Sequence, residues 1–371
     1  MTIAINAGFT DIDLRDNNTL FLFECFSKLA QQHPQHQFIY LCSGVFNEIY
    51  ITSKNTKAIS IGSFTKNSLL LQYRLNYKLP ALLRKQKVDV FISTNYCSLR
   101  TKVPQCLIIN NLYFLHHPQL FTPSWLRFYK NNTPKFLAKA TTVVTHLQFF
   151  KNEISTQYKI APDKISVSYY GINKKITPIS WEQKNVVKDE FTNGVEYFLY
   201  AGSMAPQQNL IILLKAFSFL KKRQKSNMQL IIATTGMATD EAFIKSLALY
   251  KYKKAVKFLP NLPTDAMAPI MASAYAFVYP SATEIFEPTV TQAMQSGVPV
   301  IASPSKTITE VCGNAALYCN PTDFNDIADK MMLLFKDENK RNELIVKGQQ
   351  QASIYNWNKT TDVLWQTIVN T

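Results

Sequence analysis

The stretch 268–303, APIMASAYAFVYPSATEIFEPTVTQAMQSGVPVIAS, decides the fold class of this chain. Small residues typical of a packed helix lead into the apolar run AFVYPS, and a loop that carries Glu284 and Glu287 follows. A short helix around 289–295 then precedes Gly297 and a second apolar run, PVIAS. Ligands of an open parallel sheet bind beyond the carboxyl ends of its strands, where helix N-termini favour anions. The pattern therefore predicts a parallel α/β sheet with Glu284 beside a ligand crevice.

The same alternation of apolar strands and helices extends over the whole chain. It runs from TIAIN to KISVSYYG in the first half, and from EYFLYAG to AALYCN in the second. Short connections between such elements are typical of parallel sheets covered by helices on both faces. The polar stretch 174–193 interrupts the alternation. We therefore predict two Rossmann-like, doubly wound parallel-sheet domains that face across a cleft and cover residues 1–180 and 190–355.

The composition indicates a folded protein without a membrane-spanning helix. Of the 371 residues, 47% are hydrophobic and 18% charged, a balance that supports large apolar cores. The sequence contains no apolar run of about 18 or more residues and no signal-peptide pattern at its start, so we expect a cytoplasmic location. The six cysteines show no CxxC spacing. We expect them to be reduced core residues and expect no metal site.

The net charge of +15 is concentrated in the first half of the chain. Residues 1–180 hold 21 basic and 8 acidic residues, whereas 181–371 hold 19 and 17. The asymmetry predicts an anionic partner, either acidic lipid headgroups, a phosphate-bearing acceptor or nucleic acid; a simple gain in solubility is the alternative. Stretches 69–87 and 121–140 combine basic and aromatic side chains, as helices at anionic membranes do, or as ordinary helices with a solvated face do. Nucleic acid is disfavoured because no stacking-aromatic motif of RNA-binding modules is visible.

Five segments, in this order and spacing, carry a family resemblance over nearly the whole chain. They are INNLYFLHHP at 109–118, DKISVSYYGIN at 163–173, YAGSMAPQQNL at 200–210, VKFLPNLPTDAMAPIMASAYAFVYPS at 256–281 and GVPVIASPSKTITEVCGNAALYCNPTDFNDIADKM at 297–331. With these segments the chain resembles the retaining glycosyltransferases of family 4 (glycosyl transferases group 1), which have the two-Rossmann-domain GT-B fold.

The resemblance implies a reaction, although fold resemblance alone does not establish one. Such enzymes move a sugar from a nucleotide-diphosphate sugar to a hydroxyl acceptor with retention, in glycan or glycolipid assembly. The donor would bind the second domain, and a glycan or lipid-linked acceptor would bind the first. The basic charge of the first half adds the expectation of peripheral contact at the inner membrane face. No metal or other cofactor is implied. The helix at 356–371 would pack back on the first domain through Trp357 and Trp365.

The resemblance also implies the site residues on the donor side. Glu284 would contact the transferred sugar. The remaining donor-binding candidates are Ser203, Gln207, Gln208, Asn209, Glu287 and Gln292. Glu287 is equally a helix-terminal charge without a ligand. Glu310 is expected to cap the helix in TITEVCG or to contact a ribose.

On the acceptor side, the resemblance favours a pair of histidines. His116 and His117 follow the apolar run QCLIINN, where the family's first domain contributes to the acceptor site. His146 follows another predicted strand and is either a site residue or a structural one. A lone histidine is often structural, but this loop contributes to the acceptor side in the family, so His116 and His117 share the catalytic assignment with Glu284.

Several of these positions depart from the family pattern. Gln207 and Gln208 replace a basic pair, Ser203 replaces an arginine found in some members, and Gln292 replaces a second glutamate. Further departures are the asparagines of DLRDNNTLFLFE, which replace glycines, and Asn111 and Leu147, which replace an aspartate and a serine. Neutral amides donate hydrogen bonds but cannot neutralise a departing diphosphate.

Two hypotheses follow from this tension. The first is an active family 4-like glycosyltransferase. The alternative is a non-catalytic GT-B protein that acts as the partner of an active glycosyltransferase or binds a glycan. Nucleotide affinity supports the first hypothesis, and a stable complex without nucleotide affinity supports the second.

Overall fold

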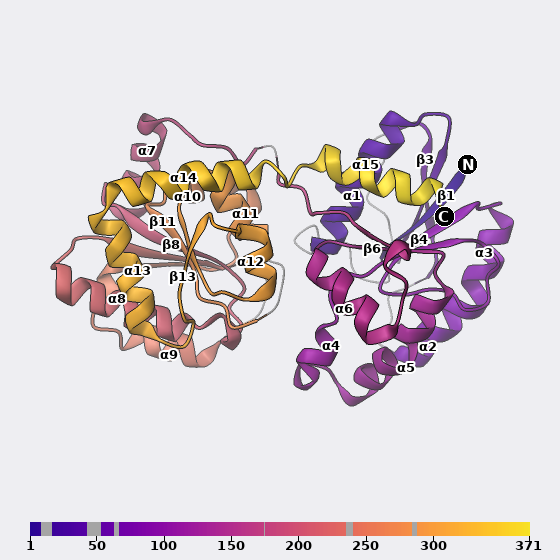
Figure 1. The fold of residues 1–371 in the computed structure, drawn as a ribbon, viewed down its shortest axis with the longest axis horizontal. Helices are drawn as coiled ribbons and strands as arrows, with labels where there is room; N and C mark the ends of the chain where they lie inside the picture. Colours follow the sequence, from indigo (N-terminus) through magenta and orange to yellow (C-terminus); the bar gives the residue numbers. More distant parts are fainter. Residues whose placement is uncertain (9–16, 43–52, 63–66, 174, 235–239, 284–287) are drawn as a thin grey trace. The chain divides into compact units, whose positions relative to one another are not determined.

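The computed structural model describes residues 1–8, 17–42, 53–62, 67–173, 175–234, 240–283 and 288–371. These residues form two compact units (Figure 1): one comprises Met1–Gly171 and Asn356–Thr371, and the other comprises Ile172–Tyr355. Each unit contains a parallel sheet with helices, so the predicted pair of doubly wound domains is confirmed. Along the sequence, the first unit ends at Gly171 and the second begins at Ile172. The stretch 174–193, which we expected to separate them, belongs to the second unit.

The described part of the first unit holds a seven-stranded parallel sheet in the order β3-β2-β1-β4-β5-β6-β7. Ile3 is paired with Phe38 on one side and with Val90 on the other. The central strands are buried along most of their length, as expected for a sheet covered on both faces. The strands are Thr2–Gly8 (β1), Gln37–Cys42 (β2), Thr56–Ser60 (β3), Val90–Thr94 (β4), Gln105–Ile108 (β5), Thr142–Thr145 (β6) and Ile165–Val167 (β7).

The helices of the first unit include those expected at 69–87 and 121–140, with one irregularity. The expected helix at 69–87 contains the π-helical segment η2 between α2 and α3. Apolar side chains of α2, η2, α3 and α5 pack in one core with those of β2, β4 and β5. The helical segments are Asn17–Gln32 (α1), Ser68–Tyr73 (α2), Arg74–Lys78 (η2), Leu79–Lys85 (α3), Tyr113–His116 (α4), Pro118–Leu120 (η3), Pro123–Lys139 (α5), Gln148–Tyr158 (α6), Pro162–Lys164 (η4) and Trp357–Val369 (α15).

Helix α15 belongs to the first unit, although it lies at the far end of the sequence. Trp357 is buried against Gly171, Tyr170 and Phe21. A Cβ on Gly171 would lie 2.3 Å from the Trp357 ring, so only glycine admits this contact. The second tryptophan, Trp365, is half-buried and stacks on His33 with ring centroids 3.7 Å apart. Trp365 therefore partly covers the turn that carries His33 and His36.

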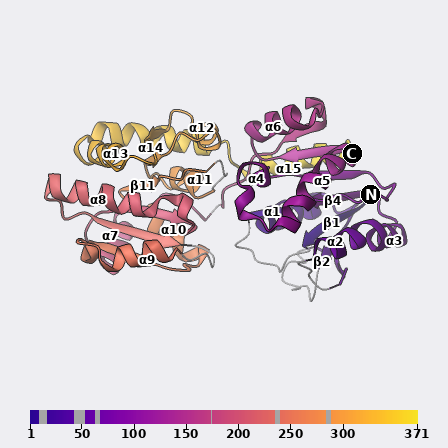
Figure 2. The ribbon, with the colours of Figure 1, turned by 90° about the horizontal axis from the view of Figure 1, so that it is seen from below.

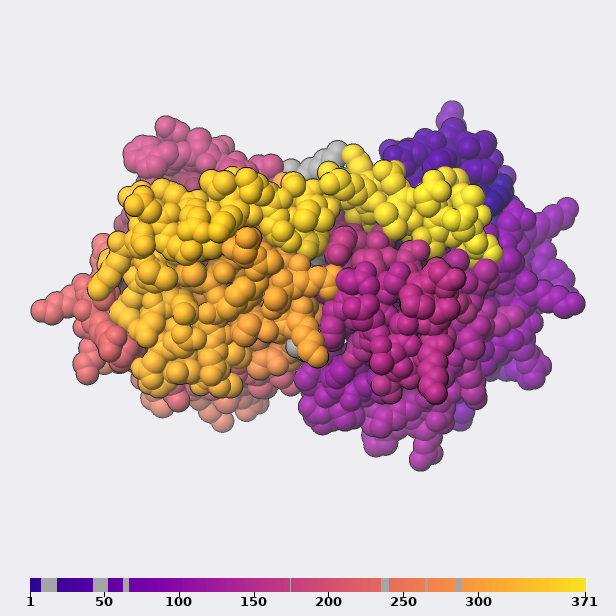
Figure 3. All heavy atoms as spheres, in the orientation of Figure 1, coloured from indigo at the N-terminus to yellow at the C-terminus, as the bar shows by residue number. Residues whose placement is uncertain are grey.

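The described part of the second unit holds a six-stranded parallel sheet in the order β10-β9-β8-β11-β12-β13. The strands are Tyr197–Gly202 (β8), Gln229–Thr234 (β9), Val256–Leu259 (β10), Ala276–Tyr279 (β11), Val300–Ala302 (β12) and Ala316–Tyr318 (β13). The helical segments are Trp181–Thr192 (α7), Pro206–Gln208 (η5), Leu210–Gln224 (α8), Glu241–Ala248 (α9), Lys253–Ala255 (η6), Thr264–Ala272 (α10), Pro288–Gln295 (α11), Lys306–Cys312 (α12), Phe324–Lys336 (α13) and Glu338–Ala352 (α14). Helix α8 lies beside α13 (Figures 1 and 2), and α13 and α14 cover one face of the unit (Figure 3).

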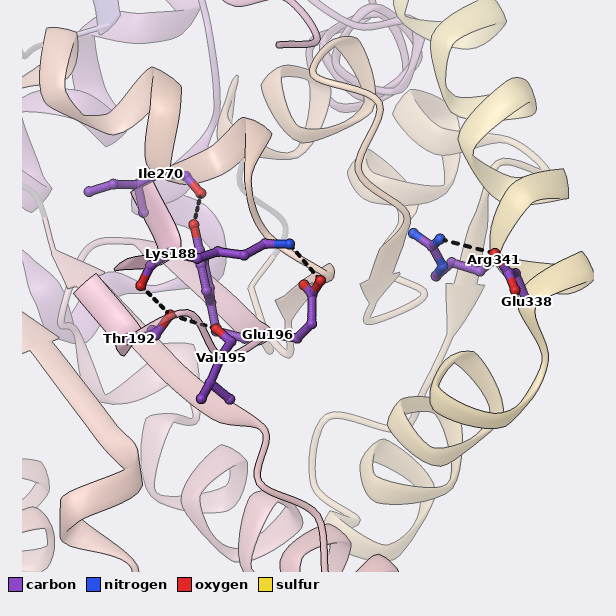
Figure 4. A network of polar contacts seen from close by, with 8 residues as sticks. Lys188, Thr192, Val195, Glu196, Ile270, Glu338 and Arg341 are labelled. Carbon is purple, nitrogen blue, oxygen red and sulfur yellow. Dashed lines mark hydrogen bonds and ion pairs between the residues drawn. The ribbon is translucent and has the colours of Figure 1, made fainter. Parts of the chain in front are cut away.

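Helix α7 occupies the stretch that the sequence suggested as a polar break. Ser180 and Gln183 form a reciprocal capping box at its start. Figure 4 shows how its end is fixed: the Thr192 hydroxyl donates to the carbonyl oxygens of Lys188 and Val195. The Lys188 ammonium, with a 10% exposed side chain, pairs with Glu196 just before β8. Residues 181–192, which lack strand periodicity, therefore form a helix with a polar face rather than a linker.

Two further expectations concern composition. All six cysteines are buried and unpaired, which confirms them as core residues. Among the described residues, no helix is both long enough and apolar enough to cross a bilayer.

Candidate functional site

The loops that leave β8 and β11 meet at the switch point of the second sheet. From β8 the chain proceeds toward β10 on one side, and β11 begins the other half of the sheet. A parallel sheet binds ligands at the carboxyl edge of such a switch point. Two hydrogen bonds join the loops there: Asn209 Nδ2 donates to Pro280 O at 2.9 Å, and Ala282 N donates to Gln207 O at 2.9 Å. The two loops therefore form one connected platform.

The turn after β8 is held in a tight conformation by aromatic packing. The Tyr200 hydroxyl donates to the carbonyl oxygen of Ser203 at 2.6 Å, and its ring stacks with Tyr279 of β11. A Cβ on Gly202 would lie 2.9 Å from the Tyr200 hydroxyl oxygen. Glycine therefore permits the approach of the ring to the turn. Ser203, which stands where some family members have an arginine, is half-buried and contributes its backbone carbonyl to this turn.

Helix α8 begins at the platform without a side-chain cap. Asn209 stands at its N-cap with left-handed backbone angles, φ 56° and ψ 34°, and its side chain turns to Pro280 instead of the helix amides. The first backbone N–H groups of α8 therefore lack the usual capping partner. Such an N-terminus is suited to an anion, because its N–H groups and the helix dipole both attract negative charge.

The side chains beside this N-terminus are neutral. Gln208 is 3% exposed, and its Oε1 has no hydrogen-bond partner among the described residues. Gln207 is half-buried. Residues 197–214 contain no lysine or arginine, and the first cation beyond them, Lys215, is exposed on the second turn of α8. The platform thus offers amide and backbone donors without a cation from its own segment.

Helix α11 brings a second N-terminus to the same edge. The Thr289 hydroxyl donates to Ala201 O at the end of β8 at 3.2 Å, and the Thr291 hydroxyl donates to Pro288 O. Gln292 lies half-buried on the next turn of this helix. Ser281 and Thr283, which precede the donor loop, share a hydroxyl contact of 2.9 Å. Glu284 and Glu287 lie outside the described residues.

The two candidate histidines of the first unit lie after β5, at the carboxyl edge of its sheet. His116 ends the short helix α4 and pairs with Glu153 of α6. The half-buried His117 packs against Tyr113 with ring centroids 4.4 Å apart. Burial lowers the pKa of His117, and the neighbouring His116 lowers it further. Asn111, where the family has an aspartate, accepts the N–H of Tyr113 at 3.0 Å and so begins α4.

A small cavity of about 70 Å³ opens at the same edge, between the ends of β4 and β5. Its polar lining side chains are Asn95, Asn111, Tyr129 and Thr133, and aliphatic and aromatic side chains complete it; neither candidate histidine lines it. Asn95 has left-handed angles, φ 62°, directly after β4. Asn95, Tyr129 and Thr133 were not expected from the sequence, although a polar residue directly after the run VFIST was the available signal for Asn95.

The structure also tests the expectations for His146 and Glu310. His146 is fully buried beside Phe21, and its Nδ1 lies 2.8 Å from Ser168 O. Burial lowers its pKa to about 4, although the Ser168 contact opposes this shift. His146 is therefore a neutral core residue. The cap expected at Glu310 is wrong: Ser305 caps α12, and Glu310 lies near the end of that helix.

The segment that carries the platform also carries a family match. Residues 182–351 match the family described as Glycosyl transferases group 1. The second unit therefore carries the sequence of a group 1 glycosyltransferase domain. The resemblance inferred from the sequence motifs is thereby confirmed at the level of this group. No cluster of three or more histidine, cysteine or acidic side chains suited to a metal occurs in the described ranges.

Two of the curated relatives that the chain resembles are named as O-antigen chain mannosyltransferases. It is 24% identical over 245 residues to "O-antigen chain mannosyltransferase B" of Escherichia coli, a match that covers 66% of this chain and 64% of that one. It is 27% identical over 234 residues to "O-antigen chain mannosyltransferase RfbU" of Salmonella typhimurium, covering 61% of each. The matches thus span somewhat less than two thirds of these relatives' lengths.

Solved structures share the fold over the whole chain. WaaG, described as a glycosyltransferase involved in lipopolysaccharide biosynthesis, superposes with a TM-score of 0.77 at 13% identity, covering 100% of both chains. Anabaena HepE in complex with UDP gives 0.75 at 15% identity, also over 100% of both. At these identities the likeness establishes the GT-B fold.

Proposed function

We propose that this protein transfers a sugar from a nucleotide-diphosphate sugar to a hydroxyl of a glycan or lipid-linked acceptor, with retention of anomeric configuration. The observation that carries the proposal is the hydrogen-bonded pair of loops at the β8–β11 switch point, with the uncapped N-terminus of α8 beside it. The names of the curated relatives favour a mannosyl donor and a surface glycan as product.

The donor diphosphate is assigned to the α8 N-terminus and its amides. In this assignment Gln207, Gln208 and Asn209 contact the nucleotide diphosphate, with Ser203 at the turn. The buried Oε1 of Gln208, which has no partner among the described residues, accepts a hydrogen bond from a hydroxyl of the nucleotide sugar. Departure of the diphosphate is stabilised by backbone N–H groups and the helix dipole, because the segment lacks cations. We propose that no metal takes part.

The remaining donor contacts are assigned to the loop and helix after β11. Gln292 on α11 hydrogen-bonds the ribose, and Glu284 contacts the transferred sugar. Glu287 is a further donor-side contact, or a charge at the start of α11. A glutamine binds a ribose less strongly than a carboxylate does, because its hydrogen bonds are not charge-assisted.

The acceptor is assigned to the carboxyl edge of the first sheet. His117, whose pKa is lowered, is neutral at pH 7 and can accept a proton from the acceptor hydroxyl. We assign His116 only a supporting role, because its Nε2 already pairs with the carboxylate of Glu153. We also assign Asn95 and Tyr129 to acceptor binding, because they line the cavity at this edge.

The charge of the first unit favours a cytoplasmic enzyme that contacts an anionic membrane. Stretches 69–87 and 121–140 hold nine of its basic residues and no acidic residue. A peripheral contact of this kind would bring the protein to a lipid-linked acceptor.

The first test is a titration of the purified protein with UDP, GDP, ADP and their sugar conjugates. We expect one nucleotide to bind with Kd near 1 μM, or about −8 kcal/mol. Glu284→Ala is expected to retain that affinity and to lose turnover. Unchanged turnover in this variant would remove the assignment of Glu284, and no heat at millimolar ligand would sink the enzyme proposal.

Gln207 and Gln208 stand where the family has a basic pair that clamps the diphosphate. This neutral pair favours one alternative, a non-catalytic partner of an active glycosyltransferase. Replacing one preorganised donor in an oxyanion site costs roughly 2.7–4 kcal/mol at the transition state, and loss of a cationic clamp should cost at least as much. This alternative expects no nucleotide affinity and a stable complex with a second glycosyltransferase. A monomer with transferase activity would dispose of it.

A further inference from the structure

A basic cavity lies at the edge of the first sheet opposite the candidate site. It has a volume of about 370 Å³ and lies between the end of α3 and the loop before β5, at the amino ends of β4 and β5. Four cationic side chains line it: Arg84, Lys87, Arg100 and Lys102. None of the ion pairs recorded for the described residues involves any of the four. The cavity therefore concentrates uncompensated positive charge.

The loop that supplies two of these cations is fixed. The Gln105 side chain bonds both backbone groups of Ser98, accepting its N–H and donating to its carbonyl oxygen at 2.8 Å each. Asn76 of η2 accepts the N–H of Leu99 at 2.8 Å. The Arg100 guanidinium lies 4.3 Å from the ring centroid of Tyr77. The cations are thus presented by a held loop rather than by a loose tail.

The helical segment beside the cavity exposes several large apolar side chains. Leu69 is 73% exposed, Tyr73 50% and Tyr77 51%, and the two tyrosine rings stack on each other. Tyr77 is the ring that Arg100 covers, so the apolar surface is continuous with the cationic cavity. Exposed leucine and tyrosine beside basic residues are suited to the boundary between lipid headgroups and acyl chains.

Charge complementarity identifies the kind of partner. Residues 54–151 contain fifteen basic residues and a single acidic one, Asp89. The Asp89 carboxylate accepts the N–H of Thr2 at 2.7 Å. A surface of this sign attracts anions and repels cationic partners.

We propose that this cavity binds the phosphate of an anionic phospholipid headgroup while Leu69, Tyr73 and Tyr77 enter the headgroup layer. The inference deepens the membrane contact in the proposed function and rests on it for the source of the phosphate. It assigns that contact to a defined site on the α3 side of the first unit, away from the carboxyl edge of its sheet. Figures 1 and 2 both show α3 at an outer edge of this unit.

The test compares two matched double variants of the full chain by co-sedimentation with vesicles. Vesicles contain phosphatidylcholine alone or with phosphatidylglycerol. Arg100→Gln with Lys102→Gln removes two cations of the cavity, whereas Lys253→Gln with Lys254→Gln removes two exposed cations of the second unit. We expect the wild type to bind only the phosphatidylglycerol vesicles, and the cavity variant to bind roughly 30-fold more weakly. The control variant should bind as the wild type does.

Three outcomes would overturn the assignment. They are equal binding by the cavity variant and the wild type, an equal loss in both double variants, and binding of inorganic phosphate in a parallel titration without vesicle association. The nucleotide titration on the same cavity variant separates this inference from the proposed activity. It should match the wild type, since the cavity lies in the first unit at the opposite edge of the sheet. Absence of nucleotide binding in both proteins would count against the transferase and leave the lipid result standing.

Discussion

Asn209 performs two structural tasks that different substitutions can separate. Its backbone is left-handed, and its side chain joins the β8 loop to Pro280 in the β11 loop. Asn209→Gly keeps the backbone conformation accessible and removes only the hydrogen bond, which is worth about 0.5–1.5 kcal/mol. Asn209→Ala also forces an L-residue with no compensating side chain into the left-handed region, at a further cost of about 1–2 kcal/mol. We predict that the free energy of unfolding falls by about 1 kcal/mol for glycine and by about 2–3 kcal/mol for alanine.

Urea unfolding measures both values, and a second asparagine provides the control. Asn193 ends α7 with nearly the same angles, φ 52° and ψ 46°, and no side-chain hydrogen bond is recorded for it in the described structure. Asn193→Ala should therefore cost only the left-handed penalty, and Asn193→Gly only a few tenths of a kcal/mol. Amide exchange supplies a local probe: the N–H of Ala282, which donates to Gln207 O, should exchange about 5-fold faster in Asn209→Gly.

Two results would refute this reasoning. If glycine and alanine at position 209 destabilise the protein equally, the left-handed conformation is not a constraint there. If Asn209→Gly leaves the Ala282 exchange rate unchanged, the side chain does not hold the two loops together. In that case the connected platform would lose its structural basis, and nucleotide affinity should also be insensitive to the substitution.

Three further predictions concern charge. Gln207→Lys should raise nucleotide-diphosphate affinity about 10-fold by adding a cation beside the α8 N-terminus, as titration calorimetry would reveal; an unchanged Kd would mean that the diphosphate binds elsewhere. Since folding lowers the pKa of His146 to about 4, its stabilising contribution is complete above about pH 6.5 and is lost as pH falls toward 4, by about 3 kcal/mol; a His146→Gln variant with the same pH profile of unfolding would contradict this. Glu196→Gln leaves the Lys188 ammonium largely buried without its partner and should cost about 1–3 kcal/mol, whereas Lys188→Met should change stability by less than about 1 kcal/mol; equal losses in denaturation would exclude a desolvation effect.

The fold was readable from the sequence because parallel strands carry a strong local signal. Runs such as QFIYLC and MQLIIAT are buried on both faces, so they are continuously apolar and stand out between amphipathic helices. The stretch 174–193 was misread because α7 carries many charges and a weak apolar face, so its composition resembles that of a linker. Its capping box, Ser180 with Gln183, was the local signal for a helix start.

The site was readable only where it follows strand ends. Gln207, Gln208 and Asn209 come soon after β8, so the topology alone assigns them to a switch point. The bond between Asn209 and Pro280 joins residues 71 positions apart and leaves no trace in local sequence. The pairing of His116 with Glu153 is similarly non-local, and it changes the part that this histidine can take.

The distribution of charge gives the two halves of the chain different physical tasks. In the proposed function, phosphate recognition at the donor platform would depend on oriented N–H groups, which act over short distances and demand exact placement of the ligand. Recognition at the basic cavity depends on full charges, which act over about a Debye length and tolerate loose placement. In these proposals the neutral, hydrogen-bonded platform would select the nucleotide sugar. The cationic first unit would attract the protein to an anionic membrane surface. If both proposals hold, the membrane contact raises the local concentration of a lipid-linked acceptor, and the oriented N–H groups of the platform stabilise the departing diphosphate without a cation from their own segment.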